Sequence, residues 1–283
     1  MQLASSMKGF RISKTSVGFG ILSLALFVYV YHETFLWLYE RYVNPDSHYS
    51  HGFLIPFVSA YLIWAKKEQL RQIIPSSSSA GLILVILALL VHVGSIWTHI
   101  FFTSGFSIWV LLVGLSLYFY GAEITKKIAF PLGFLVFMFP LPMGAVSAIS
   151  FPLKLIVADV SAACIKITGI PLFLEGAVIH LANTSLTIGD PCSGIRSLIS
   201  LLALGALIAY ISQVNRAKKW VIFLASIPIA IFSNILRVCA LILAANWWGG
   251  QWASPEHWFH VTSGMAVFVV SMILLIGLAK VLE

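Results

Sequence analysis

One short stretch of this chain combines a cysteine with small and charged neighbours, in the segment 190–198 with the sequence DPCSGIRSL. Pro191 suits the first position of a helix, which places Cys192 in the first turn. Unpaired backbone N–H groups and the helix dipole favour an anion there, and the thiolate is the reactive form of cysteine. Ser193 and Gly194 keep the surroundings of the sulfur small enough for a peptide backbone to approach. Cys192 is therefore a candidate nucleophile.

Two charged residues flank this cysteine. Arg196 lies four residues after Cys192 and so shares its helical face, where it can pair with Asp190 or stabilise the thiolate. The alternative is that Cys192 is only a small buried residue, which is common for cysteine in an apolar chain.

A second candidate group is Asn234 and Arg237, three residues apart on one face of an apolar stretch. A charge within hydrocarbon costs at least about 2.5–3.5 kcal/mol by insertion scales and normally faces a bundle interior or a cavity. Arg237 could be structural, paired with a carboxylate, but few carboxylates occur in neighbouring apolar stretches. We expect it to face Cys192 and to stabilise an oxyanion or the thiolate.

His260 begins another apolar stretch, with the sequence HVTSG. An imidazole near a thiol can take its proton and later protonate a leaving amine, and Gly264 one turn further allows a helix to approach. The alternatives are an interfacial histidine in an aromatic belt, or His257 as the base. Cys192, Arg237 and His260 together supply the nucleophile, electrostatic stabiliser and base that acyl transfer needs.

No metal or other cofactor is expected. His48 and His51 could be imagined as metal ligands together with Asp46 and His260, but their spacing matches no established ligand pattern.

The elements that must position these residues are membrane spans. The chain has 283 residues, 60% hydrophobic and 10% charged, whereas soluble domains are about 45–50% apolar and about 25% charged. The net charge of +7 comes from short clusters between apolar runs, which orient a membrane protein and do not indicate nucleic-acid binding. We expect an all-α polytopic membrane protein in a single domain, with the lipid bilayer as its solvent.

About eight spans are predicted from runs near the 20 residues or so that cross a bilayer. They cover residues 17–39, 51–65, 80–97, 103–121, 128–146, 192–213, 219–245 and 260–279.

Positive charge sets the orientation, since Lys and Arg favour cytoplasmic loops. With eight spans, five basic clusters fall on one side: the N-terminal residues, 66–71, 126–127, 216–219 and Lys280. Both termini are then cytoplasmic, and the candidate site faces the outer side.

Residues 147–191 form the predicted extracytoplasmic insert. Its first part has helical apolar spacing interrupted by charges, typical of an amphipathic helix in the interface. A ninth span there would switch the side of the later clusters. A small hairpin follows, with strands 177–181 and 186–188 around a turn, and it leads to Asp190.

These motifs resemble the signature segments of the exosortase/archaeosortase family. The resemblance rests on the segment PCSGIRS at 191–197, the Asn234 and Arg237 pair, and His260 with Gly264. The segments HGFLIP at 51–56 and PLP at 140–142 resemble further blocks of that family. The resemblance covers about residues 45–280.

The resemblance implies a membrane-embedded cysteine transpeptidase or protease of the bacterial cytoplasmic membrane, with Cys192, Arg237 and His260 as its catalytic residues. Asp190, Ser193, Gly194, Arg196, Asn234 and His51 would support them or bind substrate. Its partners would be exported proteins with a C-terminal sorting signal: a Pro-Glu-Pro-like motif, a hydrophobic span and a basic tail.

Two other functions fit part of the sequence. A transporter would explain Arg237 and the prolines of residues 128–146, but it predicts an internal repeat and polar residues in several spans. A non-catalytic subunit of an exopolysaccharide export system would leave the Cys192 segment without a reason. The sequence does not indicate an oligomeric state.

Overall fold

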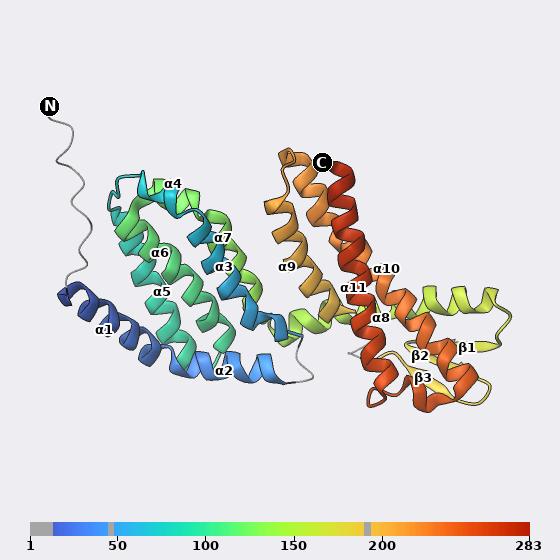
Figure 1. Cartoon of the computed structure of the whole chain (residues 1–283). Coiled ribbons are helices and arrows are strands. Elements are labelled where there is room, and N and C mark those ends of the chain that lie inside the picture. Colours follow the sequence, from blue (N-terminus) through green and yellow to red (C-terminus); the bar gives the residue numbers. More distant parts are fainter. Residues whose placement is uncertain (1–13, 45–47, 190–193) are drawn as a thin grey trace.

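The computed structural model describes residues 14–44, 48–189 and 194–283, and helices make up most of them. Figure 1 shows two groups of helices side by side, α1 to α7 in one and α9 to α11 in the other, with a small sheet beside α10.

The predicted first span is bent, because α1 (Lys14–Val30) and α2 (His32–Val43) meet at 68° around Tyr31. The bend leaves the Val30 carbonyl without an intrahelical partner, and His92 Nε2 donates to it at 3.0 Å. His92 Nδ1 lies 2.8 Å from Ser104 Oγ, which in turn lies 2.6 Å from Thr34 Oγ1. This buried polar network ties the bend to the next two helices.

Those helices are α5 (Ser79–Trp97) and α6 (Phe101–Lys127), which form an antiparallel hairpin. They approach closely at two glycines: a Cβ on Gly81 would lie 2.6 Å from the Gly114 carbonyl oxygen. Near its end α6 is interrupted at Gly121, whose φ of +83° suits glycine.

Short elements lie between this hairpin and the second group: η1 (Ser50–Phe53), α3 (Leu54–Ala65), α4 (Lys67–Arg71), α7 (Ala129–Phe134) and η2 (Leu135–Met138). The predicted span 128–146 is not one helix, because Pro140 and Pro142 end it after η2. Tyr49, two residues before the segment 51–56, contacts the segment 140–142, since its hydroxyl accepts a hydrogen bond of 3.0 Å from the Leu141 N–H. Burial raises the pKa of Tyr49.

The residues of the predicted insert form α8 (Met143–Ile167) and a three-stranded antiparallel sheet of β1 (Leu172–Glu175), β2 (Val178–Leu181) and β3 (Ser185–Thr187). The helix begins four residues before the predicted insert, directly after Pro142. β2 pairs with β3 on either side of the expected turn, with Ile179 opposite Leu186, and β1 adds a strand that was not expected. One face of the sheet packs on α8 and α10 through a core that includes Ile179 and Val157.

The last group contains α9 (Ile195–Ile211), α10 (Arg216–Trp248), η4 (Gly250–Ala253) and α11 (Trp258–Leu282). α10 continues through Pro228 without a break. Ile222 and Leu275 are fully buried between these helices. The two groups meet where α3 and α7 pack against α9, through a cluster that includes Ile55 and Ala203.

Basic residues of separate predicted clusters come together at one end of the helices. Lys66 Nζ donates to the Lys127 carbonyl at 2.6 Å and lies 5.3 Å from the Tyr210 ring centroid. Lys219 Nζ donates to the Tyr210 carbonyl at 3.0 Å. We call this the basic end. It corresponds to the side that the charge pattern assigns to the cytoplasm.

The chain is a multi-pass membrane protein by the length and apolarity of its helices. Among the described residues, five helices are long and apolar enough to cross a membrane, or six if the bent pair counts as one span. Three further predicted spans are shorter apolar helices, 50–65, 129–138 and 195–211. α8 is one of the five, yet Figure 1 shows it running across the direction of α9 and α11. If the bent pair counts as one span, α8 is left out and the three shorter helices are added, the number of spans is eight, as predicted from the sequence. That count stays a prediction.

Candidate active site

A cleft of about 550 Å³ lies away from the basic end, where the starts of α9 and α11 meet the interior of α10 at Arg237. Its polar lining comes from Arg196, Ser197, Ser200, Arg237 and His260. Its apolar lining includes Val261, Met265 and Val269 of α11, which are 54%, 68% and 46% exposed. In a membrane protein such side chains contact lipid, so the cleft joins a polar floor to an apolar outer wall.

Gly194 brings the cysteine segment against α10. It caps the start of α9 with a φ of +80°, a left-handed conformation that favours glycine. A Cβ there would lie 2.8 Å from Asn234 Nδ2, so the glycine also makes room for the buried Asn234 side chain. The structure thus brings together Gly194 and Asn234, which the sequence placed in separate motifs.

The Arg237 side chain extends from α10 to α11, and the residue is only 8% exposed. Its Nη2 donates to the His260 carbonyl oxygen at 3.2 Å. A Cβ on Gly264 would lie 3.2 Å from both Arg237 Cζ and Nη2, so the guanidinium rests on the bare backbone of Gly264. The glycine expected to admit a neighbouring helix admits this side chain instead.

His260 lies beside Arg237 and is buried at the start of α11. Its Nδ1 is 3.0 Å from the Ala253 carbonyl oxygen of η4. A carbonyl only accepts, so Nδ1 carries a proton and Nε2 is the basic nitrogen of the neutral ring. His257, the competing base, instead caps α11 by accepting from the Phe259 N–H at 3.2 Å.

The first group of helices reaches the cleft through η1. Ser50 lines the cleft, and His51 Nδ1 lies 3.2 Å from Ser200 Oγ of α9. Sequence reasoning missed Ser200, although its position four residues after Arg196 puts it on the same face of α9.

Three predicted site residues, Asp190, Cys192 and Ser193, lie outside the described residues, as does Asp46 of the metal hypothesis. Within the described part of the chain, no group of three or more metal-binding side chains is found.

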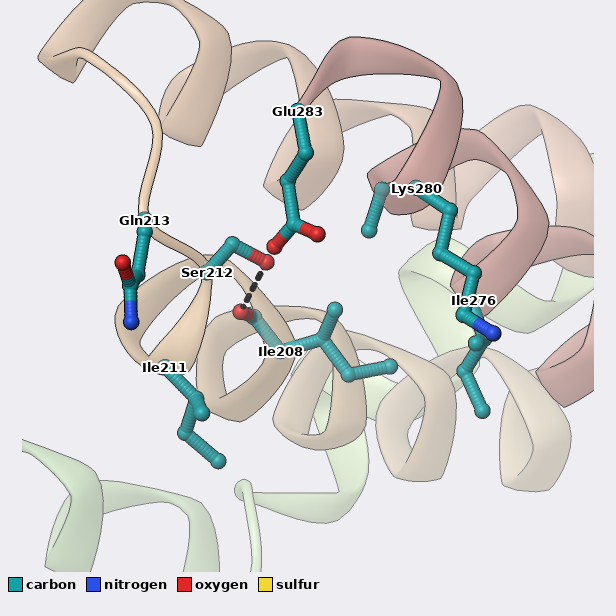
Figure 2. A pocket seen from close by; sticks show the side chains of 8 residues that line it. Ile208, Ile211, Ser212, Gln213, Ile276, Lys280 and Glu283 are labelled. Atoms are coloured by element: carbon teal, nitrogen blue, oxygen red, sulfur yellow. Dashed lines mark hydrogen bonds between the residues drawn. The ribbon is translucent and has the colours of Figure 1, made fainter.

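A larger cavity, of about 610 Å³, lies at the basic end between α9 and the end of α11 (Figure 2). Its lining includes Ser212, Gln213, Lys280 and Glu283, and the Ser212 hydroxyl donates to the Ile208 carbonyl at 2.9 Å. Arg237 and His260, the predicted catalytic residues that the structure describes, do not line it, so size alone does not identify the site.

Comparison with known proteins gives one match. A sequence model of the transmembrane exosortase family matches residues 39–277, which include every described residue of the cleft. No curated protein and no solved structure matches.

Proposed function

Because this chain belongs to the transmembrane exosortase family, we propose that it is a membrane-embedded cysteine protease or transpeptidase. Cys192 is the nucleophile, His260 the general base and Arg237 the electrostatic stabiliser. The observation that carries the proposal is the contact between Arg237 and His260 in a cleft that is also lined by Arg196 and Ser197, four and five residues after the cysteine.

Chain connectivity supports the role of Cys192. Gly194 is two positions further along the chain, so the Cα atoms of the two residues are at most about 7 Å apart. Gly194 packs on Asn234, one helical turn before Arg237.

The proposed reaction begins when His260 Nε2 accepts the proton of the Cys192 thiol. The thiolate adds to a peptide carbonyl, and Arg237 stabilises the negative charge that develops on its oxygen. The C–N bond then breaks, the leaving amine takes the proton from the imidazolium, and the acyl group remains on sulfur as a thioester. An amine or water attacks the thioester and restores the thiol.

The apolar wall of the cleft supports a membrane-anchored substrate. Val261, Met265 and Val269 extend from the polar floor along α11, so a substrate helix can lie against α11 while the peptide next to it enters the cleft. The substrates we propose are exported proteins with a C-terminal motif, hydrophobic span and basic tail. The cleft then faces the outer side of the bacterial cytoplasmic membrane, with the basic end in the cytoplasm.

The proposal is tested by replacing Cys192 with Ala and with Ser. Cells expressing each variant also express an exported reporter with a C-terminal Pro-Glu-Pro-like motif, hydrophobic span and basic tail. We expect the reporter to keep its tail in both variants and to lose it with the original chain, as followed by its size.

Cys164→Ser is the matched control, since Cys164 is an exposed free thiol that does not line the cleft. It should process the reporter normally. Continued processing by both Cys192 variants at matched membrane levels would contradict the nucleophile assignment, and transporter or assembly functions would then be the ones to test.

A further inference from the structure

A third cavity, of about 490 Å³, lies in the first group of helices. It is next to the cleft that Arg237 and His260 line, which we call the active cleft. It is formed where the end of α2, the α5–α6 turn and the segment 140–143 meet, at the end of the molecule away from the basic end. His48 and Tyr49 line this cavity while Ser50 lines the cleft, so one short segment separates the two.

The polar lining of this cavity is basic. Arg41, His48 and His99 contribute to it together with Asn44, and none of its described lining residues is acidic. The Arg41 guanidinium lies 5.8 Å from the Trp37 ring centroid, and its Nη1 is 3.8 Å from the Met143 sulfur.

Arg41 has no carboxylate partner in the described part of the chain, where the ion pairs are Arg71 with Glu68 and His180 with Glu175. A guanidinium held by an aromatic ring and a thioether keeps its donors suited to an added anion.

His99 occupies a position at which glycine is favoured. Its φ is +56°, and it is the single non-glycine residue with positive φ among those the structure describes. The Ile100 N–H donates to the Ser95 carbonyl and the His99 N–H to the Ile96 carbonyl, the pattern of a Schellman motif with His99 at the left-handed position. A non-glycine residue in this conformation is strained, and strain of this kind concentrates at functional sites, ligand-binding segments among them.

The rim of the cavity is apolar and faces outward. Ile100, Leu141 and Met143 line it and are 51%, 39% and 63% exposed. A ligand that fits both the basic lining and the apolar rim of this cavity carries a negative charge next to a hydrocarbon chain.

We propose that this cavity binds the phosphate group of an anionic phospholipid from the membrane leaflet on this side. Arg41 and His99 contact the phosphate, and the acyl chains lie along Ile100 and Met143. The bound lipid ties the α5–α6 turn to α2 and to the segment that ends at the active cleft. This site is distinct from the proposed catalytic site and does not depend on it.

The test measures lipid retention by the full chain. The protein is placed in nanodiscs of phosphatidylcholine mixed with phosphatidylglycerol, extracted into detergent, and the phospholipid that stays bound is counted by native mass spectrometry. Arg41→Gln should lower phosphatidylglycerol retention at least about tenfold, since a charge-assisted hydrogen bond contributes about 1.5–3 kcal/mol.

His99→Gly removes the imidazole and also relieves the backbone. Its Tm in pure phosphatidylcholine should equal or exceed that of the original chain, while phosphatidylglycerol retention falls several-fold. Lys166→Gln is the matched control, because it removes an exposed positive charge that does not line the cavity. It should retain lipid as the original chain does.

Equal phosphatidylglycerol retention by Arg41→Gln and the original chain would overturn the proposal, as would an equal loss in Lys166→Gln. Displacement of the lipid by dilute glycerol 3-phosphate would point to a soluble phosphate ligand and overturn the lipid assignment. Unchanged lipid retention with lost reporter processing in Arg41→Gln would assign the cavity to the substrate peptide instead.

Discussion

Two regions of this molecule bury a histidine between apolar helices, and the contacts of the two imidazole rings differ. In the first group of helices, His92 has both ring nitrogens committed, one to Ser104 and one to the Val30 carbonyl. In the second, His260 bonds through Nδ1 to the Ala253 carbonyl and lines a cleft beside Arg237. Burial and polarity are shared, so they do not mark function. What differs is that His260 lines a cleft, whereas His92 has both ring nitrogens occupied within the helix packing.

The largest expected effect separates the two histidines. His260→Ala should lower reporter processing about 10²–10⁴-fold, the usual contribution of general acid–base catalysis, at an unchanged amount of protein in the membrane.

His92→Ala should instead lower stability, because each buried group left without a partner costs about 1–3 kcal/mol. A lower Tm in detergent, with normal processing per folded molecule, is the expected result. The comparison fails if His92→Ala abolishes processing at normal stability, or if His260→Ala acts only through protein level.

A smaller effect is expected from Gly264→Ala, which adds a methyl group 3.2 Å from the Arg237 guanidinium. Displacing the guanidinium should reduce processing about 10- to 100-fold, since misplacement by about 1 Å can cost 10² in rate.

Gly277→Ala is its control on the same helix, where the added Cβ meets nothing within 4 Å. Reporter cleavage followed over time in both variants makes the measurement. Equal rates would mean that the position of Arg237 does not matter to the reaction.

The smallest effect is expected from Ser200→Ala, which removes the hydrogen bond between α9 and His51. A neutral hydrogen bond contributes about 1 kcal/mol, so processing should fall only about two- to fivefold. A loss as large as that of His260→Ala would place Ser200 or His51 in the chemistry rather than in support of it.

The sequence predicted the class of the fold, because apolar runs separated by basic clusters have few solutions other than membrane helices. It also predicted Arg237 and His260 as site residues, and the structure places them in contact. The expected helix boundaries differed at Tyr31, where a bend divides an apolar run that looked continuous, and at Pro140, where the prolines noted in the run 128–146 end the helix. Hydropathy reports the solvent of a segment and not its direction, so composition left open whether α8 lies in the interface, as expected, or crosses the membrane.

By itself the sequence determined the membrane as solvent, the basic side and the motifs that identify the family. These depend on composition and order along the chain. Only the tertiary structure decided that Gly194 packs on Asn234 and Gly264 on Arg237, and that the Ala253 carbonyl sets the tautomer of His260. Such contacts join residues on different helices, and their distances depend on how those helices pack, which no local pattern encodes.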